Sequence, residues 1–350
     1  MGLVMCDWVT GRVRVAPEWV DVHGVWDSGQ VRVFGPGGEV LGHFPRRSSA
    51  EGSHSSNITF RAGLAGTELE LSGNPVKFFQ GHNLFGSSDP VALFLSAGHR
   101  LRAEGLEFPS PASWRSYSCS LSLSRVDLTR SYRFGSNAAA AAWIAAVGRY
   151  SRTRVGSGSF SGDTLYFGKN STYYSVKIYL KSKEMVARKK GHLLPFSFPD
   201  PDRKELLDWG EGVVRFEVTL RSRVLNTLGL DFDPMEQWLK YVGKVDFMGS
   251  PAKSRELLER PEVLGLPNPT RLALAAWVYG DSETVRSLSR PTAYRYRAQI
   301  RKAVGVDIFG PCPEDSSELS AELDPAGWDP EPIEHLSFKP DAGLRSAYGL

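Results

Sequence analysis

The sequence YYSVKIYLKSKE, which occupies Tyr173–Glu184, alternates between apolar and polar residues as a β-strand does. Tyr174, Val176, Ile178 and Leu180 point to one face of the predicted strand. The other face carries Tyr173, Ser175, Lys177, Tyr179 and Lys181. Tyr179 therefore lies between two lysines, which favour loss of its phenolic proton and offset the charge of a phosphate diester. The alternative interpretation is an exposed strand whose lysines are solvated.

The composition is that of a soluble globular protein without membrane partners. The 350 residues are 41% hydrophobic, and no apolar run approaches the 18 residues that a membrane span needs. The N-terminus lacks the basic and apolar regions of a secretory signal. Cys6, Cys119 and Cys312 are odd in number and far apart, so they form neither a disulfide framework nor a CxxC metal site. A reducing cytoplasm is the expected location.

Charge is distributed unevenly along the chain, whose overall net charge is only +3. Between Arg125 and Lys190 there are 13 Lys/Arg residues and three acidic residues, a net charge of +10. This block surrounds the tyrosine segment and predicts a polyanionic partner. Eight acidic residues and no Lys/Arg lie between Glu314 and Glu334. We therefore predict an acidic, disordered tail over residues 311–350.

Strand and helix patterns interleave over residues 1–245. Short β segments joined by turns fill residues 1–135, and an alanine-rich helix follows over Ala138–Arg149. Val213–Arg221 alternates as a strand, and Asp233 caps a further helix. This order predicts an α+β fold in which an antiparallel sheet carries helices on one face.

Three predicted strands carry a carboxylate opposite their apolar residues, namely Glu70, Asp127 and Glu217. If these strands are neighbours, the carboxylates and Tyr179 converge over one sheet, and such oxygen ligands suit Mg²⁺ or Mn²⁺. His82 is a further candidate for a metal ligand or phosphate contact, although a lone histidine is often structural. The sequence contains no HxH, HExxH, P-loop or GxSxG motif, which argues against zinc proteases, NTPases and α/β-hydrolases.

Residues 246–310 have the pattern of a small helical domain. A helix over Arg271–Tyr279, a short helix over Ser282–Leu288 and a third helix from Ser289 to Val304 resemble a helix-turn-helix. The third helix is basic and contains two tyrosines. Its cations are Arg290, Arg295, Arg297, Arg301 and Lys302. DNA contact by this helix is one interpretation, and a packing domain with a solvated basic face is the other.

Four blocks of the sequence, in the same order, resemble the gene II protein family, the replication initiators of filamentous bacteriophages. The blocks are NPVKFFQGHNLFG at Asn74–Gly86, LSRVDLT at Leu123–Thr129, IYLKSKE at Ile178–Glu184 and GVVRFEV at Gly212–Val218. The last three are also similar, more loosely, to initiators of rolling-circle plasmids with a degenerate HUH nuclease fold. The histidine pair of that fold is absent from this sequence.

The resemblance implies a DNA endonuclease that starts rolling-circle replication in the cytoplasm of a bacterial host. Such an enzyme nicks one strand at the plus-strand origin, stays joined through a tyrosine to the 5′ phosphate, and later rejoins the displaced strand. The implied partners are double-stranded origin DNA, single-stranded DNA and the host helicase and polymerase. The family's catalytic tyrosine falls on Tyr179, while Tyr173 and Tyr174 remain rival nucleophiles.

We expect Tyr179 to attack phosphorus, with Lys181 and Lys177 lowering its pKa and stabilising the transition state. The expected metal ligands are Asp127 and Glu217, with Glu70 or His82 as the third. The predicted DNA contacts are Arg125 and Arg215 on the sheet and the five cations of the third C-terminal helix. A relaxase of a mobile element and a non-catalytic DNA-binding regulator are the alternatives.

Overall fold

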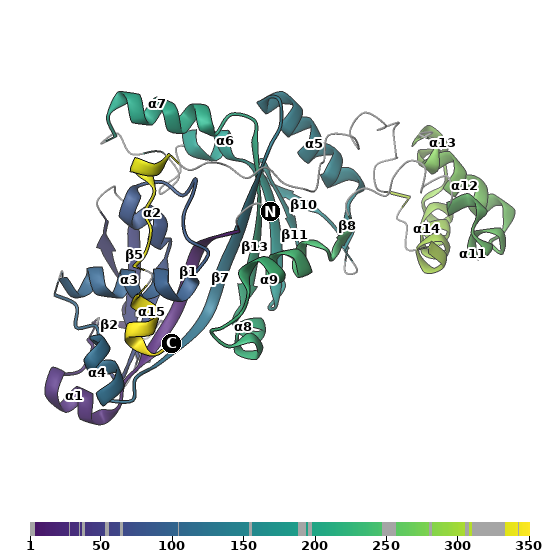
Figure 1. Cartoon of the computed structure of the whole chain (residues 1–350). Coiled ribbons are helices and arrows are strands. Elements are labelled where there is room, and N and C mark those ends of the chain that lie inside the picture. The colour runs from purple at the N-terminus through teal and green to yellow at the C-terminus, as the bar shows by residue number, and fades with distance from the viewer. Residues whose placement is uncertain are drawn as a thin grey trace.

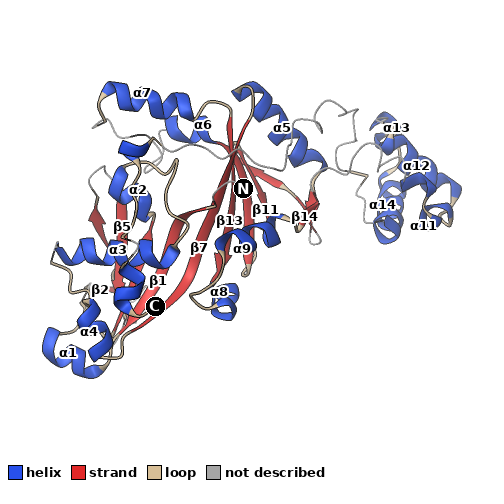
Figure 2. Cartoon of the chain, viewed as in Figure 1, coloured by secondary structure: helices blue, strands red, loops and turns tan. Residues whose placement is uncertain are grey.

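A large antiparallel sheet and the helices packed on it form most of the molecule (Figures 1 and 2). The computed structural model describes residues 4–27, 29–34, 36, 39–52, 56–63, 66–103, 105–153, 156–187, 194, 198–246, 257–279, 282–304, 308–309, 333–341 and 343–350. Within that part of the chain, no helix has the length and apolar character needed to cross a membrane.

The main sheet has nine strands in the order β10-β11-β12-β13-β7-β1-β6-β5-β4, and every neighbouring pair is antiparallel. Its strands are β1 (Met5–Arg14), β4 (Ser48–Glu51), β5 (Asn57–Ala62), β6 (Glu68–Gly73), β7 (Ser120–Arg133), β10 (Ser159–Ser161), β11 (Thr164–Phe167), β12 (Tyr174–Leu180) and β13 (Val213–Arg221). The two smaller sheets consist of β2 (Gln30–Phe34) with β3 (Val40–Pro45), and of β8 (Arg152–Thr153), β9 (Gly156–Ser157) and β14 (Val245–Asp246).

Helices connect the strands and form the C-terminal region. Those among the strands are α1 (Pro17–His23), α2 (Pro75–Gln80), α3 (Pro90–Ala103), α4 (Pro111–Ser116), α5 (Asn137–Tyr150), α6 (Lys181–Val186), α7 (Asp200–Trp209), α8 (Ser222–Leu228) and α9 (Pro234–Val242). Those that follow are η1 (Leu257–Glu259), α11 (Pro261–Leu264), α12 (Asn268–Val278), α13 (Ser282–Arg286), α14 (Arg290–Val304), η2 (Glu334–Leu336) and α15 (Leu344–Tyr348).

The two faces of the main sheet differ because polar and apolar residues alternate along its strands. On the apolar face, Phe216 of β13 packs 5.6 Å from Trp143 of α5 and 6.3 Å from Trp238 of α9, between ring centroids. Helix α3 also packs on this face, where a Cβ at Gly11 would lie 2.8 Å from the Phe94 ring. The predicted α+β class with a large antiparallel sheet is confirmed, and the polar face is left to form the candidate site.

Helices α11 to α14 pack around a hydrophobic cluster of their own, which includes Val263, Leu274 and Ile300. The succession of α12, α13 and α14 follows the three helices expected from the sequence. Whether they act as a helix-turn-helix domain with boundaries at residues 246 and 310 stays a prediction.

The prediction of a disordered tail over residues 311–350 is wrong for its last residues. Residues 310–332 lie outside the described residues, but α15 packs against α3 and α4. Tyr348 is 1% exposed, lies 5.1 Å from the Trp114 ring and donates a 2.7 Å hydrogen bond to the Pro109 carbonyl. Two buried side chains, Leu344 and Tyr348, and the ion pairs of Arg345 with Asp89 and Asp231 hold this segment on the domain.

Candidate active site on the polar face of the sheet

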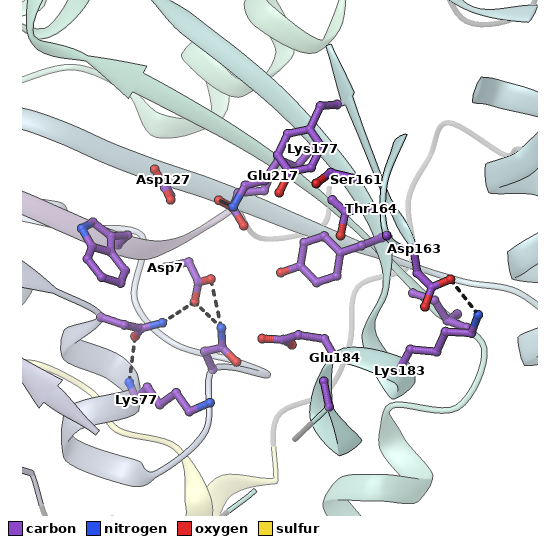
Figure 3. A pocket seen from close by; sticks show the side chains of 18 of the residues that line it. Asp7, Lys77, Asp127, Ser161, Asp163, Thr164, Lys177, Lys183, Glu184 and Glu217 are labelled. Carbon is purple, nitrogen blue, oxygen red and sulfur yellow. Dashed lines mark hydrogen bonds and ion pairs between the residues drawn. The ribbon is translucent and has the colours of Figure 1, made fainter. Parts of the chain in front are cut away.

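A cleft of about 730 Å³ opens on the polar face, over the four adjacent strands β12, β13, β7 and β1. Because alternate residues of a strand share a face, Lys177 lies opposite Glu217 and Tyr179 lies opposite Arg215 on the neighbouring strand. The residues of these four strands that line the cleft are Asp7, Trp8, Arg125, Asp127, Lys177, Tyr179, Leu180 and Glu217, and residues of β5, β10 and β11 also border it. Figure 3 shows Asp7, Asp127, Glu184 and Glu217 arranged around this space. The structure thus brings together the predicted nucleophile and two of the predicted carboxylates.

Tyr179 is only 9% exposed, and its register partner on β13 is the buried Arg215. Burial raises the pKa of Tyr179 well above its ordinary value, and the nearby Glu184 and Glu217 carboxylates raise it further. Arg215 acts in the opposite direction and lowers it. The cation beside the phenol is therefore an arginine of the neighbouring strand.

The predicted position of Lys181 is corrected, because β12 ends at Leu180 and Lys181 begins α6. Its side chain is 1% exposed, donates to Asn83 Oδ1 at 2.7 Å and pairs with Glu184. Burial, followed by the charge of Arg215, lowers the pKa of Lys181 to about 8. Lys181 supports residues that line the cleft instead of facing a substrate itself.

Arg215 is fully buried, so the expectation that it contacts DNA from an exposed sheet face is corrected. Its guanidinium donates to the carbonyl oxygens of Asn83 and Leu84 at 2.5 and 2.8 Å. These carbonyls belong to the segment after α2, which covers this end of the polar face. Alternation within β13 predicts the face correctly but carries no information about a segment that covers it.

Asp7 and Asn83 are two cleft residues that sequence reasoning missed. Asn83 Nδ2 lies 2.7 and 2.9 Å from the two carboxylate oxygens of Asp7, while its own carbonyl groups accept from Lys181 and Arg215. Asp7 also accepts from Asn74 Nδ2 at 2.8 Å. The unusual Asn74–Gly86 block was the signal for Asn83. Asp7 lies where the register of β1 shifts, which no alternating pattern reveals.

Asp127 and Glu217 are both buried and carry opposite pKa shifts. Burial raises the pKa of Glu217 to about 8; the Lys177 ammonium opposes this shift and Asp127 reinforces it. Burial also acts on Asp127, but the Arg125 guanidinium, at 2.9 Å from Oδ1 and 2.5 Å from Oδ2, holds its pKa below the usual value. Arg125 therefore favours the ionised form of Asp127, while burial opposes ionisation of Glu217.

Glu70 and His82, the two predicted third ligands, lie outside this cleft. Glu70 accepts hydrogen bonds from three arginines. His82 Nδ1 accepts from the Leu84 N–H at 3.4 Å, and its Nε2 lies 3.1 Å from the Leu336 carbonyl. Among the described residues, no group of three or more His, Cys, Asp or Glu side chains is arranged to hold a metal ion.

A pair of carboxylates still suits one class of cation. Mg²⁺ keeps most of its water shell and is commonly held by one or two carboxylates together with the phosphate of its substrate. Asp127 and Glu217 fit that requirement, since both are buried carboxyl residues that line the same cleft.

The remaining predicted DNA contacts occupy two places. Arg125 lines the cleft with its guanidinium carbon 5.0 Å from the centre of the Trp8 ring. Along α14, Arg290, Arg295, Arg301 and Lys302 are exposed and Arg297 is half-buried. These α14 contacts stay a prediction.

The rival tyrosines do not line the cleft. Tyr173 is half exposed, and its ring lies 5.2 Å from the Arg223 guanidinium. Tyr174 points to the other face of β12, where its ring packs 4.5 Å from that of Tyr241. Position in the fold therefore favours Tyr179 among the three.

The buried imidazole of His82 is expected to make the protein less stable in acid. Burial lowers the pKa of His82 to about 3, whereas an unfolded histidine titrates near 6.5. The unfolded chain binds the extra proton below pH 6.5, so the folded state loses stability as pH falls from 6.5 towards 3. We expect a loss of about 1.4 kcal/mol between pH 7.5 and pH 5.5 from this group.

Thermal unfolding of the protein and of His82→Gln at the two pH values measures this contribution. The glutamine variant is expected to be less stable at pH 7.5 but to lose less stability on acidification. An equal loss in both proteins would show that His82 does not carry the effect.

Known proteins resemble this chain over most of its length. Residues 5–245 match the family described as replication-associated protein G2P, N-terminal. Over 322 residues the chain is 31% identical to the replication-associated protein G2P of Enterobacteria phage I2-2, covering 87% of this chain and 88% of that protein. The solved structure of a rolling circle replication initiator protein from Geobacillus stearothermophilus matches with 11% identity and a TM-score of 0.27, over 70% of this chain and 86% of that one.

Proposed function

The chain belongs to the replication-associated protein G2P family, and we propose that it is a site-specific DNA nickase and strand transferase that initiates rolling-circle replication at a phage plus-strand origin. One observation carries the proposal. A buried tyrosine, Tyr179, shares a cleft with the carboxyl groups of Asp127 and Glu217 and lies opposite a buried arginine of the neighbouring strand. A nucleophile, a cation beside it and a carboxyl pair are the groups that phosphoryl transfer through a phosphotyrosine requires.

Tyr179 supplies the nucleophile. Its oxygen forms a bond to phosphorus while the bond from phosphorus to the 3′ oxygen breaks, and the 3′ oxygen leaves as a hydroxyl after taking a proton. Arg215 stabilises the phenolate as the phenol loses its own proton. The phosphotyrosine keeps the energy of the broken phosphodiester. A 3′ hydroxyl can therefore attack it and rejoin the strand without ATP.

Asp127 and Glu217 would hold Mg²⁺ or Mn²⁺ together with the phosphate of the substrate. Such an ion supplies Lewis-acid polarisation of the scissile phosphate. Arg125 and Lys177, which pair with these two carboxylates, lie at the same cleft and add positive charge towards an anionic substrate. For Lys177 we propose one of its two predicted roles, stabilisation of the transition state as a cation of the cleft.

The proposed partners are double-stranded origin DNA and single-stranded DNA, followed by the host helicase and polymerase in the bacterial cytoplasm. The exposed cations of α14 are the proposed contacts to duplex DNA. They lie on one long helix, and Arg295 stacks 5.3 Å from the centre of the Tyr296 ring.

The direct test is incubation with supercoiled circular DNA that carries the replication origin of the genome encoding this chain. With Mg²⁺ we expect nicked circles and protein attached covalently to a 5′ end, and we expect EDTA to abolish both products. Denaturing gels and peptide mapping of the nuclease-trimmed adduct measure them. Binding without cleavage would support a non-catalytic regulator, and nicking without a covalent adduct would contradict the tyrosine mechanism.

A further inference from the structure

Four arginines form a cluster on the polar face of the sheet, next to the cleft. Arg12 of β1, Glu70 of β6 and Arg61 of β5 are register partners across three neighbouring strands, so their side chains share one face. Arg47, from the turn before β4, and Arg14, two residues along β1, complete the group. We call Arg12, Arg14, Arg47 and Arg61 the arginine patch.

Three members of the arginine patch converge on one carboxylate. Arg47, Arg61 and Arg12 lie 2.7, 3.0 and 3.2 Å from the oxygens of Glu70. Arg14 pairs with Glu68 at 3.0 Å. Four guanidinium groups thus face two carboxylates, which leaves an excess of two positive charges. A single arginine would neutralise Glu70, so ion pairing within the fold does not account for the other two.

The positive charge of the arginine patch is accessible, while the negative charge beneath it is covered. The four arginine side chains are between 37% and 70% exposed, whereas Glu70 is 8% exposed and Glu68 is 23% exposed. An anion that approaches this face meets guanidinium groups first. Glu70 holds three of them side by side, which reduces the side-chain entropy that an anion would otherwise have to remove.

The patch and the cleft form one continuous surface. Arg47 Nη1 lies 3.2 Å from the hydroxyl of Thr59, a residue that lines the cleft. Between Arg12 and the cleft, the hydroxyls of Thr10 and Ser72 are hydrogen-bonded at 2.7 Å across β1 and β6. Arg12 is four residues from Trp8 along β1, or about 13 Å at 3.4 Å per residue. That distance corresponds to about four steps along one strand of duplex DNA.

We propose that the arginine patch binds the phosphate backbone of the DNA that flanks the cut site, about four nucleotides beyond the edge of the cleft at Trp8. The inference rests on the proposed nicking function and adds to it the surface that holds the flanking strand. Guanidinium groups match phosphate oxygens in charge and in geometry. The side chains of the patch offer charge and no aromatic plane, so this contact adds affinity and register without reading bases.

The test uses Arg47→Gln combined with Arg61→Gln, which leaves Glu70 paired with Arg12 and so avoids an unpaired buried carboxylate. Binding of origin DNA is measured over a series of salt concentrations, on substrates extended on only the 5′ or only the 3′ side of the cut. On the side that reaches the patch, the slope of log affinity against log salt is expected to weaken. The expected change is about 0.9 per lost contact on duplex and about 0.7 on a single strand, so the value identifies which form is bound.

A matched control removes two cations from the other side of the sheet. Arg100→Gln with Arg102→Gln, in the last turn of α3, is expected to leave both slopes unchanged. Cleavage of a short single strand, too short to reach the patch, is expected to be the same for the patch variant and the parent. If the parent itself fails to nick supercoiled origin DNA, the proposed function fails, whatever the slopes are.

Parent cleavage together with unchanged salt slopes on every extended substrate would overturn the patch proposal. If the double variant does not fold, the single variant Arg14→Gln serves instead. Arg14 is 70% exposed and its loss leaves Glu68 with Arg12 at 3.5 Å, so its removal is expected to lower the slope by one contact.

Discussion

Replacing Tyr179 with phenylalanine is expected to abolish nicking and the covalent protein–DNA adduct while leaving origin binding within about twofold of the parent. The change removes one buried oxygen and keeps the aromatic ring that fills the site. Loss of a nucleophile typically costs about 10⁴-fold or more in rate, because no other group can form the covalent intermediate. The measurement is the rate of nicked-circle formation with Mg²⁺, together with the fraction of protein that becomes attached to a 5′ end.

The matched controls for Tyr179→Phe are the same substitution at the two neighbouring tyrosines. Tyr173→Phe and Tyr174→Phe are expected to keep nicking within a few-fold of the parent, since neither residue lines the cleft. Full nicking activity of Tyr179→Phe would contradict the assignment of Tyr179 as the nucleophile. An adduct on Tyr173 or Tyr174 would show that one of these residues, and not Tyr179, is the nucleophile. The proposed reaction would still hold.

The alternating pattern of the strands predicted which residues share a face. Asp127, Lys177, Tyr179 and Glu217 all lie on the polar face, because a period of two places them there whatever surrounds the sheet. Antiparallel pairing of β12, β13 and β7 then makes them neighbours. The face on which each of these residues lies could therefore be predicted from sequence alone, whereas their convergence depends on the strand order.

Strand order and long-range cover could not be predicted in the same way. Glu70 is on the correct face, but β6 lies beyond β1 in the sheet, so Glu70 meets arginines instead of Asp127. His82 meets a carbonyl of Leu336, 254 residues away in the chain. Neither contact has a local signal in the sequence.

The same limit explains Arg215, whose strand pattern is that of an exposed residue. It is buried because the segment after α2 folds over β13 and offers two carbonyl groups to its guanidinium. Placing a charge there requires those partners, since an unpaired buried guanidinium would be very unfavourable. The contact between this arginine and the segment that covers it forms only in the folded chain, so no local sequence pattern predicts it.

Removing the charge of Arg215 and removing the charge of Glu184 are expected to shift the pH dependence of nicking in opposite directions. The rate should rise with pH until the phenol is ionised. Arg215 lowers the pKa of Tyr179, so Arg215→Gln should shift this rise to higher pH and slow nicking about 10²- to 10³-fold at neutral pH. Glu184 is the charge that raises the pKa most, so Glu184→Gln should shift the rise to lower pH.

Single-turnover nicking rates between about pH 6 and pH 10, with thermal unfolding of each variant, measure the two shifts. Glutamine at position 215 keeps a donor for one of the two carbonyls, and the other costs about 1–3 kcal/mol of stability if it is left without one. Glutamine at position 184 can still accept from Lys181. A purely structural Arg215 would lower the rate equally at every pH. Profiles that shift in the same direction, or not at all, would show that the ionisation of Tyr179 does not control the reaction.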